Sequence, residues 1–341
     1  MIKEFIKKVG TGPHGVRDLT REEAAKAAGL LLSGTVTPAQ TGALLLGLRL
    51  KGETGEEMGG FLDSLRAILP PRPSPSPFDL DIGDPYDGKT RSISLVVPAA
   101  INAARMGISI ILHGLPGVPV KQGPGVVDVW RSLGRTLSKP GERLASEGKG
   151  AVCCLSQESF LPDLARLLPI RQELGLRTLW NTVEKCVNPL DSRAQIIGIF
   201  HEPVIEKLRQ AFTTEKSLPP RRILFVCGSE GGVDLHTHRA THCHLLDPAL
   251  GPDLQSVTIP PPGKSPSSLS PPGEGPGLAR ILEEIAKDPD HPVATHLRRQ
   301  TALFLFASGK CETFEEAEEQ VADGGSIHGP ITPSPPSRSH P

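Results

Sequence analysis

Residues 19–57 read LTREEAAKAAGLLLSGTVTPAQTGALLLGLRLKGETGEE, and three helix starts follow one another in this stretch. Each start is a capping box: a threonine hydroxyl accepts a hydrogen bond from an early helical N–H, and a Glu or Gln side chain reaches back. Gly34 and Gly52 follow apolar segments, where a left-handed residue would end a helix. With the opening segment, this predicts four short helices up to about Leu69. The boxes begin at Thr20, Thr37 and Thr54.

The proline-rich stretch PPRPSPSP at residues 70–77 cannot continue a helix, because proline lacks a backbone donor and restricts the residue before it. We therefore expect a stiff hinge over residues 70–80. Beyond it, apolar runs alternate with helical segments, a pattern typical of a parallel sheet covered on both faces. The predicted strands are residues 92–97, 108–112, 151–155, 194–200 and 223–227.

The expected fold class is α/β, with a small N-terminal helical domain (residues 1–69) hinged to a larger α/β domain (residues 81–323) that has a mainly parallel central sheet. The Pro-, Gly- and Ser-rich segment 260–276 predicts a flexible loop. The tail, residues 324–341, has almost no apolar content and is expected to be disordered.

Composition narrows the functional classes. One Tyr, two Trp and ten Phe among 341 residues leave few platforms on which bases of single-stranded nucleic acid could stack. Residues 1–222 carry 29 Lys and Arg against 23 Asp and Glu, whereas residues 223–341 carry 8 against 15. The first part could therefore meet a polyanion although the net charge is −1, but an ordinary surface also explains so small a difference.

No apolar stretch approaches the length of a membrane span, and the amphipathic N-terminus is too charged for a signal peptide. The six cysteines show no repeated CxxC spacing and lie in or beside apolar runs, which is typical of buried reduced thiols. These features predict a cytoplasmic protein with no membrane partner.

Several separate segments resemble one family. Residues 19–25, 32–40 and 48–54 look like the N-terminal helical domain of the anthranilate phosphoribosyltransferase family (glycosyltransferase family 3), a family of tryptophan biosynthesis. Residues 171–181, RQELGLRTLWN, together with Asn188 and Pro189, are similar to its substrate-side segment, and His113-Gly114 matches a His-Gly at a strand end. The resemblance covers roughly residues 1–235 and more loosely 303–316.

The resemblance implies phosphoribosyl transfer from phosphoribosyl pyrophosphate to an aromatic or nitrogenous acceptor such as anthranilate, with Mg²⁺ as cofactor. It also implies a homodimer joined through the helical domain, to which a segment near residues 160–190 would return. Asp234 is the implied metal ligand, and Arg171 corresponds to the arginine for the anthranilate carboxylate, although a plain salt bridge explains it equally well. The implied substrate-binding residues are Gly83, Asp87, Gly88, Ser94, His113, Gly114, Lys121, Arg171 and Asn181.

The sequence departs from the family pattern at the positions that the resemblance implies for binding phosphate and metal. The glycine-rich turn GTGGD becomes Gly83-Asp84-Pro85-Tyr86-Asp87, in which a proline removes a donor and a carboxylate adds repulsion to a phosphate cradle. The hydroxyl-bearing Asn-Ile-Ser-Thr becomes Ser94-Leu-Val-Val97, and the metal-binding Asp-Glu becomes Asp234-Leu235. Glu184-Lys185 replaces a Gly-Pro. Together these changes argue against the standard reaction.

The alternative function is that of a non-catalytic relative that binds DNA or RNA through the old phosphate cleft. A divergent branch of the family is known to bind nucleic acid, and Tyr86-Asp87-Gly88 and His113-Gly114 resemble its sequence. The candidate contacts are Lys89, Arg91, Lys121, Arg131 and Arg135.

The string DLHTHRATHCH at residues 234–244 suggests a third possibility. A hairpin with its turn at residues 239–241 would bring four imidazoles together, and imidazole suits zinc and other transition metals. The spacing matches no established zinc framework, so an exposed polar hairpin is the simpler interpretation.

Overall fold

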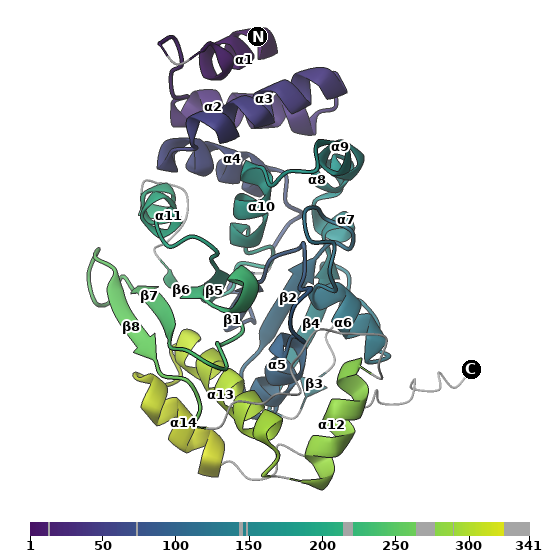
Figure 1. The fold of residues 1–341 in the computed structure, drawn as a ribbon, viewed down its shortest axis with the longest axis vertical. Helices are drawn as coiled ribbons and strands as arrows, with labels where there is room; N and C mark the ends of the chain where they lie inside the picture. The colour runs from purple at the N-terminus through teal and green to yellow at the C-terminus, as the bar shows by residue number, and fades with distance from the viewer. Residues whose placement is uncertain are drawn as a thin grey trace.

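The computed structural model describes residues 1–323 apart from 13, 73, 143–145, 148, 214–220, 264–276 and 289. The predicted tail at 324–341 and most of the predicted loop at 260–276 lie outside the described residues. The four N-terminal helices stack at the top of Figure 1, above the sheet, and the last three helices lie below it.

The three capping boxes are formed as predicted. The hydroxyls of Thr20, Thr37 and Thr54 accept backbone N–H groups three residues on, at 3.2, 3.3 and 3.2 Å. Each N3 side chain returns the bond to the backbone N–H of its threonine. Gly52 follows its helix with φ of +83°, a value that favours glycine. These helices are α1 (Ile2–Gly10), α2 (Arg21–Leu32), α3 (Pro38–Lys51) and α4 (Gly55–Ala67).

An eight-stranded sheet forms the centre of the larger part, in the order β3-β4-β2-β1-β5-β6-β7-β8. The five strands from β4 to β6 run parallel, whereas β3, β7 and β8 pair antiparallel at the two edges. The predicted fold class is thus confirmed. The strands are β1 (Leu80–Gly83), β2 (Ile110–Gly114), β3 (Ser146–Glu147), β4 (Gly150–Ser156), β5 (Ala194–Gly198), β6 (Arg222–Cys227), β7 (Thr241–Leu246) and β8 (Gln255–Ile259).

Alternate residues of the strands enter two separate cores, because successive side chains point to opposite faces of a sheet. On β2, Ile110 and Leu112 pack in one core, and Ile111 packs in the other. The first core contains α5 (Val96–Arg105), α6 (Val126–Ser132), α12 (Gly277–Lys287), α13 (Pro292–Ala307) and α14 (Phe314–Asp323). The second contains the helical domain, α11 (Val204–Thr213) and the segment after β4.

The segment after β4 returns to the helical domain. α9 packs against α3, and α10 packs against both α3 and α4. Gly175 separates these helices with φ of +59°. The short elements of this segment are α7 (Gln157–Phe160), α8 (Pro162–Ala165), α9 (Leu168–Leu174), α10 (Leu179–Val183) and the 3₁₀ turn η1 (Glu184–Cys186).

One predicted strand is wrong. Residues 92–95 form an irregular segment, and α5 begins at Val96. The backbone N–H of Leu95 donates to the carboxylate of Asp234 at 2.8 Å, so a partner distant in the sequence takes the bond that a strand would need. β1 lies instead at Leu80–Gly83.

All six cysteines are free thiols, and only Cys227 is not fully buried. This agrees with the predicted packing role. Among the described residues, no helix is both long and apolar enough to cross a bilayer.

Candidate functional site

Arg171, the implied acceptor arginine, lies in an internal ion pair. Its Nη1 and Nη2 atoms donate to Oε2 and Oε1 of Glu184, each at 2.8 Å. Both side chains are 1% exposed. Gln157 adds a third bond to this carboxylate, from Nε2 to Oε2 at 3.2 Å. Nη1 and Nη2 of Arg171 therefore already hold a carboxylate of the chain itself, whereas Nε is buried without a hydrogen-bond partner among the described residues.

Asp234, the implied metal ligand, is also paired internally. Lys89 Nζ lies 2.5 Å from its Oδ2 atom, and both side chains are about 5% exposed or less. The Ser94 hydroxyl donates to the same oxygen at 2.9 Å. Together with the N–H of Leu95 on Oδ1, these contacts surround the carboxylate with donors from the segment before α5.

Asp84, in the turn after β1, is a second buried carboxylate near Asp234. Burial, and secondarily the charge of Asp234, raises its pKa to about 6. Its Oδ1 atom accepts the backbone N–H of Val233 at 2.9 Å. A carboxyl with so raised a pKa is a poor ligand for a cation at lower pH, because the proton competes for the same oxygens.

Glu230 fills a cradle of backbone donors in the segment that follows the glycine turn. Its carboxylate accepts the N–H groups of Thr90 at 3.1 Å and Arg91 at 3.0 Å, and the Ser92 hydroxyl at 3.0 Å. These bonds lower the pKa of Glu230 against the opposing effect of burial. Converging main-chain N–H groups of this kind form an anion-binding concavity, and here the anion is a side chain of η2 (Ser229–Gly231).

Close packing requires glycine in the turn after β1 and, less strictly, at the end of β2. A Cβ atom on Gly83 would lie 2.3 Å from the carbonyl oxygen of Lys185, and one on Gly88 would lie 2.1 Å from that of Gly123. Gly88 also has φ of +66°. A Cβ atom on Gly114 would meet Val126 and Val127 at 3.3 Å, a tight but smaller conflict. Glycine at these positions therefore allows neighbouring chain segments to approach closely, which explains the residues without a bound ligand.

His113 is fully buried in a polar chain that links the ends of β1 and β2. Its Nδ1 atom bonds to the hydroxyl of Tyr86, and its Nε2 atom lies 3.2 Å from Oδ2 of Asp81. Gln195 donates to Oδ1 of Asp81 at 3.0 Å. Burial raises the pKa of Tyr86 well above its usual value, so the phenol stays protonated.

The remaining predicted residues lie around Asp87. Arg177 donates to Oδ2 of Asp87 at 2.7 Å, and Lys121 Nζ lies 3.5 Å from its Oδ1. Lys121 also donates to the carbonyl of Glu230 at 3.1 Å. Asn181, at the start of α10, donates to the carbonyl of Pro119 at 3.0 Å.

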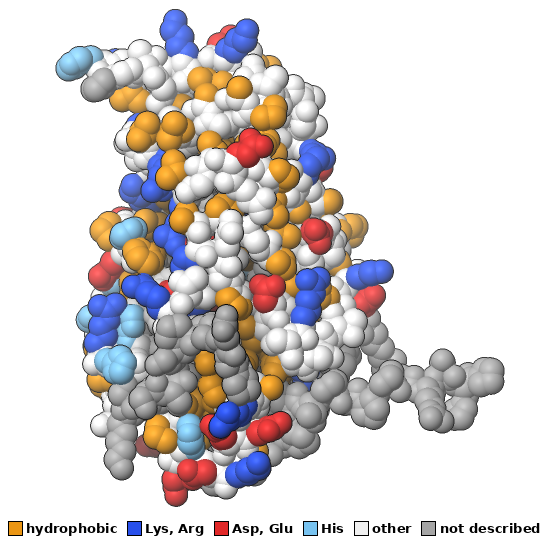
Figure 2. Space-filling view, turned by 45° about the vertical axis from the view of Figure 1, so that its right-hand side comes forward, with side chains coloured by type: hydrophobic (Ala, Val, Ile, Leu, Met, Phe, Trp, Pro, Cys, Tyr) orange, Lys and Arg blue, Asp and Glu red, His pale blue; other side chains and the backbone are white. Residues whose placement is uncertain are grey.

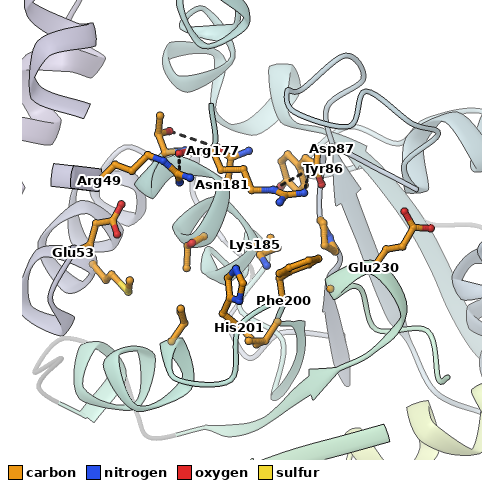
Figure 3. Close-up of a pocket in the computed structure, with 17 residues that line it drawn as sticks. Arg49, Glu53, Tyr86, Asp87, Arg177, Asn181, Lys185, Phe200, His201 and Glu230 are labelled. Atoms are coloured by element: carbon orange, nitrogen blue, oxygen red, sulfur yellow. Dashed lines mark hydrogen bonds and ion pairs between the residues drawn. The ribbon is translucent and has the colours of Figure 1, made fainter. Parts of the chain in front are cut away.

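A cavity of about 220 Å³ opens between the helical domain and the ends of β1 and β5. Arg49 and Glu53 line one side, Phe200 and His201 line another, and Lys185 lies between them (Figure 3). Phe200 is 52% exposed. The guanidinium of Arg177 lies 5.3 Å from the centre of its ring.

Comparison with known proteins identifies the family. The model described as "Glycosyl transferase family, helical bundle domain" matches residues 3–68, and "Glycosyl transferase family, a/b domain" matches residues 87–325. An anthranilate phosphoribosyltransferase of Dictyoglomus turgidum is 32% identical over 236 residues, which cover 69% of this chain and 67% of that protein. The chain belongs to the anthranilate phosphoribosyltransferase family.

An uncharacterized protein of Aquifex aeolicus is similar over more of the chain, with 28% identity over 323 residues, or 94% of this chain and 98% of that protein. Among solved structures, the anthranilate phosphoribosyltransferase of Thermus thermophilus shares the fold with a TM-score of 0.73 and 24% identity, covering 94% of this chain and 93% of that chain. The Saccharomyces cerevisiae enzyme in complex with PRPP and Mg gives 0.72 and 16%, covering 94% and 92%.

Three internal partners of the family's site residues were not predicted from the sequence. Glu184, Glu230 and Lys89 occupy Arg171, the backbone cradle and Asp234 respectively. Glu184-Lys185 was visible as a departure from the family's Gly-Pro, which was the one available signal. Nothing in the spacing could have placed Glu230 against residues about 140 positions earlier.

The nucleic-acid candidates do not form one surface of free cations. Lys89 is buried in its ion pair, whereas Arg91 is 74% exposed and Arg131 is exposed. Arg135 stacks on Trp130, with its guanidinium 4.9 Å from the ring centre. Figure 2 shows basic and histidine side chains gathered at mid-height along the left edge, with acidic and basic side chains mixed lower down.

The predicted histidine hairpin is wrong. β7 begins only at Thr241 and pairs with β6 and β8, because Leu245 and Cys243 enter the first core. His244 bonds to Glu202 at 2.7 Å, and His242 is exposed. Within the described ranges, no three His, Cys, Asp or Glu side chains are placed to hold a metal ion.

Proposed function

We propose that this member of the anthranilate phosphoribosyltransferase family does not transfer a phosphoribosyl group to anthranilate. The Arg171–Glu184 ion pair carries this proposal. An anthranilate carboxylate could reach Arg171 only by displacing Glu184, which would then be a buried charge without its partner. Separating a buried pair in this way costs about 3–5 kcal/mol, and this cost opposes binding of the acceptor at Arg171.

The donor side supports the same conclusion. A pyrophosphate group at the cradle of Thr90 and Arg91 would meet the Glu230 carboxylate, and repulsion between like charges opposes that approach. Asp84 adds a further carboxylate in the turn after β1.

The residues present do not fit Mg²⁺. This ion usually reaches a phosphate through one or two carboxylates and several waters. Asp234 is paired with the ammonium of Lys89 and carries two further donors, so its oxygens face positive charge already. We therefore propose no step that uses the metal.

The test combines the protein with phosphoribosyl pyrophosphate, Mg²⁺ and anthranilate and measures pyrophosphate release. We expect none above a blank without protein. Release that requires both anthranilate and the protein would contradict the proposal. Release that appears only with another aromatic or nitrogenous acceptor would show that the protein transfers the phosphoribosyl group to that acceptor instead.

Binding of single-stranded DNA or RNA is a second candidate, and Phe200 is the observation that favours it. An exposed aromatic ring with Arg177 over its face and His201 against its edge is the arrangement on which a base can stack. Phe200→Ala should weaken binding at least tenfold, whereas Leu250→Ala, at another exposed apolar side chain, should leave it unchanged. Undetectable binding at low salt, or equal loss in both variants, would remove this candidate.

A homodimer joined through the helical domain is the third part of the proposal. Leu46 and Leu50 lie one turn apart on α3 and are 38% and 78% exposed. Leu176, which follows α9 on the neighbouring return segment, is 40% exposed. Arg49 of α3 donates to the carbonyl of Arg177, so the two segments are neighbours. Exposed large apolar side chains on neighbouring segments are typical of an interface.

A further inference from the structure

A cluster of arginines lies where the hinge after α4 meets the sheet. Arg66 is in the last turn of α4, Arg72 is in the hinge, and Arg221 directly precedes β6. Asp191, which precedes β5, accepts a hydrogen bond from Nη2 of Arg221. The cluster is therefore at the edge where β5 and β6 begin, whereas the turn after β1 and the cavity beside it lie at the edge where the parallel strands end.

Two guanidinium nitrogens of this cluster are buried without a hydrogen bond. Nη1 of Arg72 and Nη1 of Arg221 have no such partner in the part of the chain that the structure describes. Nη1 of Arg72 lies 3.8 Å from Oδ1 of Asp191, which is close enough for an ion pair and too far for a hydrogen bond. Buried donors are nearly always satisfied by the protein, by water or by an ion. These two nitrogens therefore favour an acceptor that is not part of the chain.

The local charge favours an anion as this acceptor. Burial, and secondarily the charges of Arg66 and Arg72, lowers the pKa of Arg221 to about 10, and the charge of Asp81 opposes this from β1. Within the described ranges, three guanidinium groups thus share two carboxylates, Asp191 and Asp81. An added anion would balance the excess positive charge.

The geometry lets one ion contact both arginines. Arg72 and Arg221 approach the same oxygen, Oδ1 of Asp191. Guanidinium donors lie in a fixed plane that matches the oxygens of phosphate or sulfate. The side chains of Arg72 and Asp191 are 24% and 29% exposed, so solvent ions reach one side of the cluster. Because both Nη1 atoms are themselves enclosed, an ion in contact with them must be small, and an ester group attached to it would collide with the protein.

We propose that this arginine cluster binds an inorganic oxyanion, phosphate or sulfate, which accepts hydrogen bonds from Nη1 of Arg72 and Nη1 of Arg221. Arg66 donates to the carbonyls of Cys186 at 2.9 Å and Val187 at 3.3 Å, so the cluster already joins α4 to the segment before β5. The ion therefore strengthens the connection between the helical domain and the sheet. Its binding does not depend on whether phosphoribosyl transfer occurs.

The test is isothermal titration of the full chain with inorganic phosphate and with sulfate, in chloride buffer of constant ionic strength. We expect saturable binding of at least one of the two ions, and the tighter one identifies the ligand. Ribose 5-phosphate should bind at least tenfold more weakly, because its sugar cannot enter the enclosed cluster. No saturable binding of either inorganic ion, or equal binding of ribose 5-phosphate, would overturn the proposal.

An arginine variant assigns the ion to the cluster. Arg72→Met should weaken binding of the ion at least fivefold, because it removes one of the two donors and a positive charge. Arg193→Met is the matched control at the same edge of the sheet, where the side chain is 72% exposed and pairs with Asp79. It should change the affinity less than twofold. Unchanged binding in Arg72→Met, or equal weakening in both variants, would contradict the assignment.

Asp191→Asn tests the same site in the opposite direction and keeps the test valid even if Arg72→Met does not fold. The φ of Asp191 is +63°, a value that asparagine also tolerates. The variant removes the carboxylate that competes with the ion for Arg72 and Arg221, so it should bind the ion at least threefold more tightly than the wild type. A purely structural ion pair would lower stability in this variant without changing the affinity for the ion. Unchanged or weaker binding in Asp191→Asn would therefore overturn the proposal.

Discussion

The guanidinium of Arg171 and the carboxylate of Glu184 face each other through two hydrogen bonds of 2.8 Å, and each side chain is 1% exposed. The two residues are 13 positions apart, one on α9 and the other in η1 after α10. The pair therefore joins the middle of the segment that returns to the helical domain to its C-terminal end. Because of this pair, the arginine that corresponds to the family's acceptor arginine binds a carboxylate of its own chain.

Removing one member of this pair should destabilise the protein strongly. Glu184→Ala should lower the free energy of unfolding by about 3–5 kcal/mol, because Arg171 would keep a buried charge without its partner. Replacing both residues by Met and Leu should cost less than either single change. Urea unfolding measures this, with Asp163→Ala as the control, because the exposed Arg166–Asp163 pair should contribute less than about 1 kcal/mol. Equal losses at the two sites would count against a buried role.

The ammonium group of Lys89 should block binding of Mg²⁺ at the Asp234 carboxylate. Lys89→Ala should lower stability and also expose the Asp234 carboxylate to solvent ions. Mg²⁺ should then raise the unfolding temperature of the variant and leave that of the wild type unchanged. Arg91→Ala, at a 74% exposed side chain, is the matched control. A wild type that Mg²⁺ stabilises as much as the variant would show that Lys89 does not block the carboxylate.

Asp84 should make stability fall as the pH rises. Its folded pKa of about 6 lies above its ordinary value of 3.8, so the folded state holds this proton more tightly than the unfolded state. The resulting stabilisation is complete below pH 4 and is lost as the pH passes 6. Relative to the wild type, Asp84→Asn should gain on the order of 2–3 kcal/mol between pH 4 and pH 7. Urea unfolding at both pH values tests this, and a difference independent of pH would refute it.

Removal of the Glu230 carboxylate should free the backbone cradle for an external anion. Glu230→Ala should be less stable than the wild type, since hydrogen bonds to a charged group contribute about 1.5–3 kcal/mol. Sulfate should restore part of the loss in this variant and have a smaller effect on the wild type. Thermal unfolding with sulfate, and with chloride at matched ionic strength, distinguishes specific binding from general salt. An identical response of both proteins would argue against an anion site here.

Leu50 should contribute to a dimer. Leu50→Asp places a charge on the exposed apolar face of α3 and should shift the particle from dimer to monomer in light scattering. Leu250→Asp, at a 58% exposed leucine outside the helical domain, should not. A monomeric wild type would show that this face has another use.

The elements that the sequence predicted well are those with local signals. The capping boxes of Thr20, Thr37 and Thr54 need only residues three positions apart, so they could be identified without any tertiary contact. The helical domain and the parallel strands followed from them and from apolar runs. β1 was not predicted because it contains Asp81, a buried acid whose contacts in the described part of the chain are with Gln195 and His113.

The sequence predicted which residues belong to the site, but it did not predict which residues of the chain they contact. Arg171, Asp234 and Lys121 stand out in the sequence, but nothing there shows that the chain provides the opposing charge for each. Those partners depend on contacts such as that between Glu230 and Thr90, which are 140 residues apart. No periodicity or spacing encodes such a contact, and only the packed structure brings the two residues together.

The most direct measurement is a titration of the wild-type protein with phosphoribosyl pyrophosphate, with and without Mg²⁺. If Glu230 and Lys89 occupy the places of the phosphate and the metal, we expect no saturable heat under either condition, and Glu230→Ala should bind more tightly than the wild type. Saturable binding by the wild type that Mg²⁺ strengthens would contradict the account.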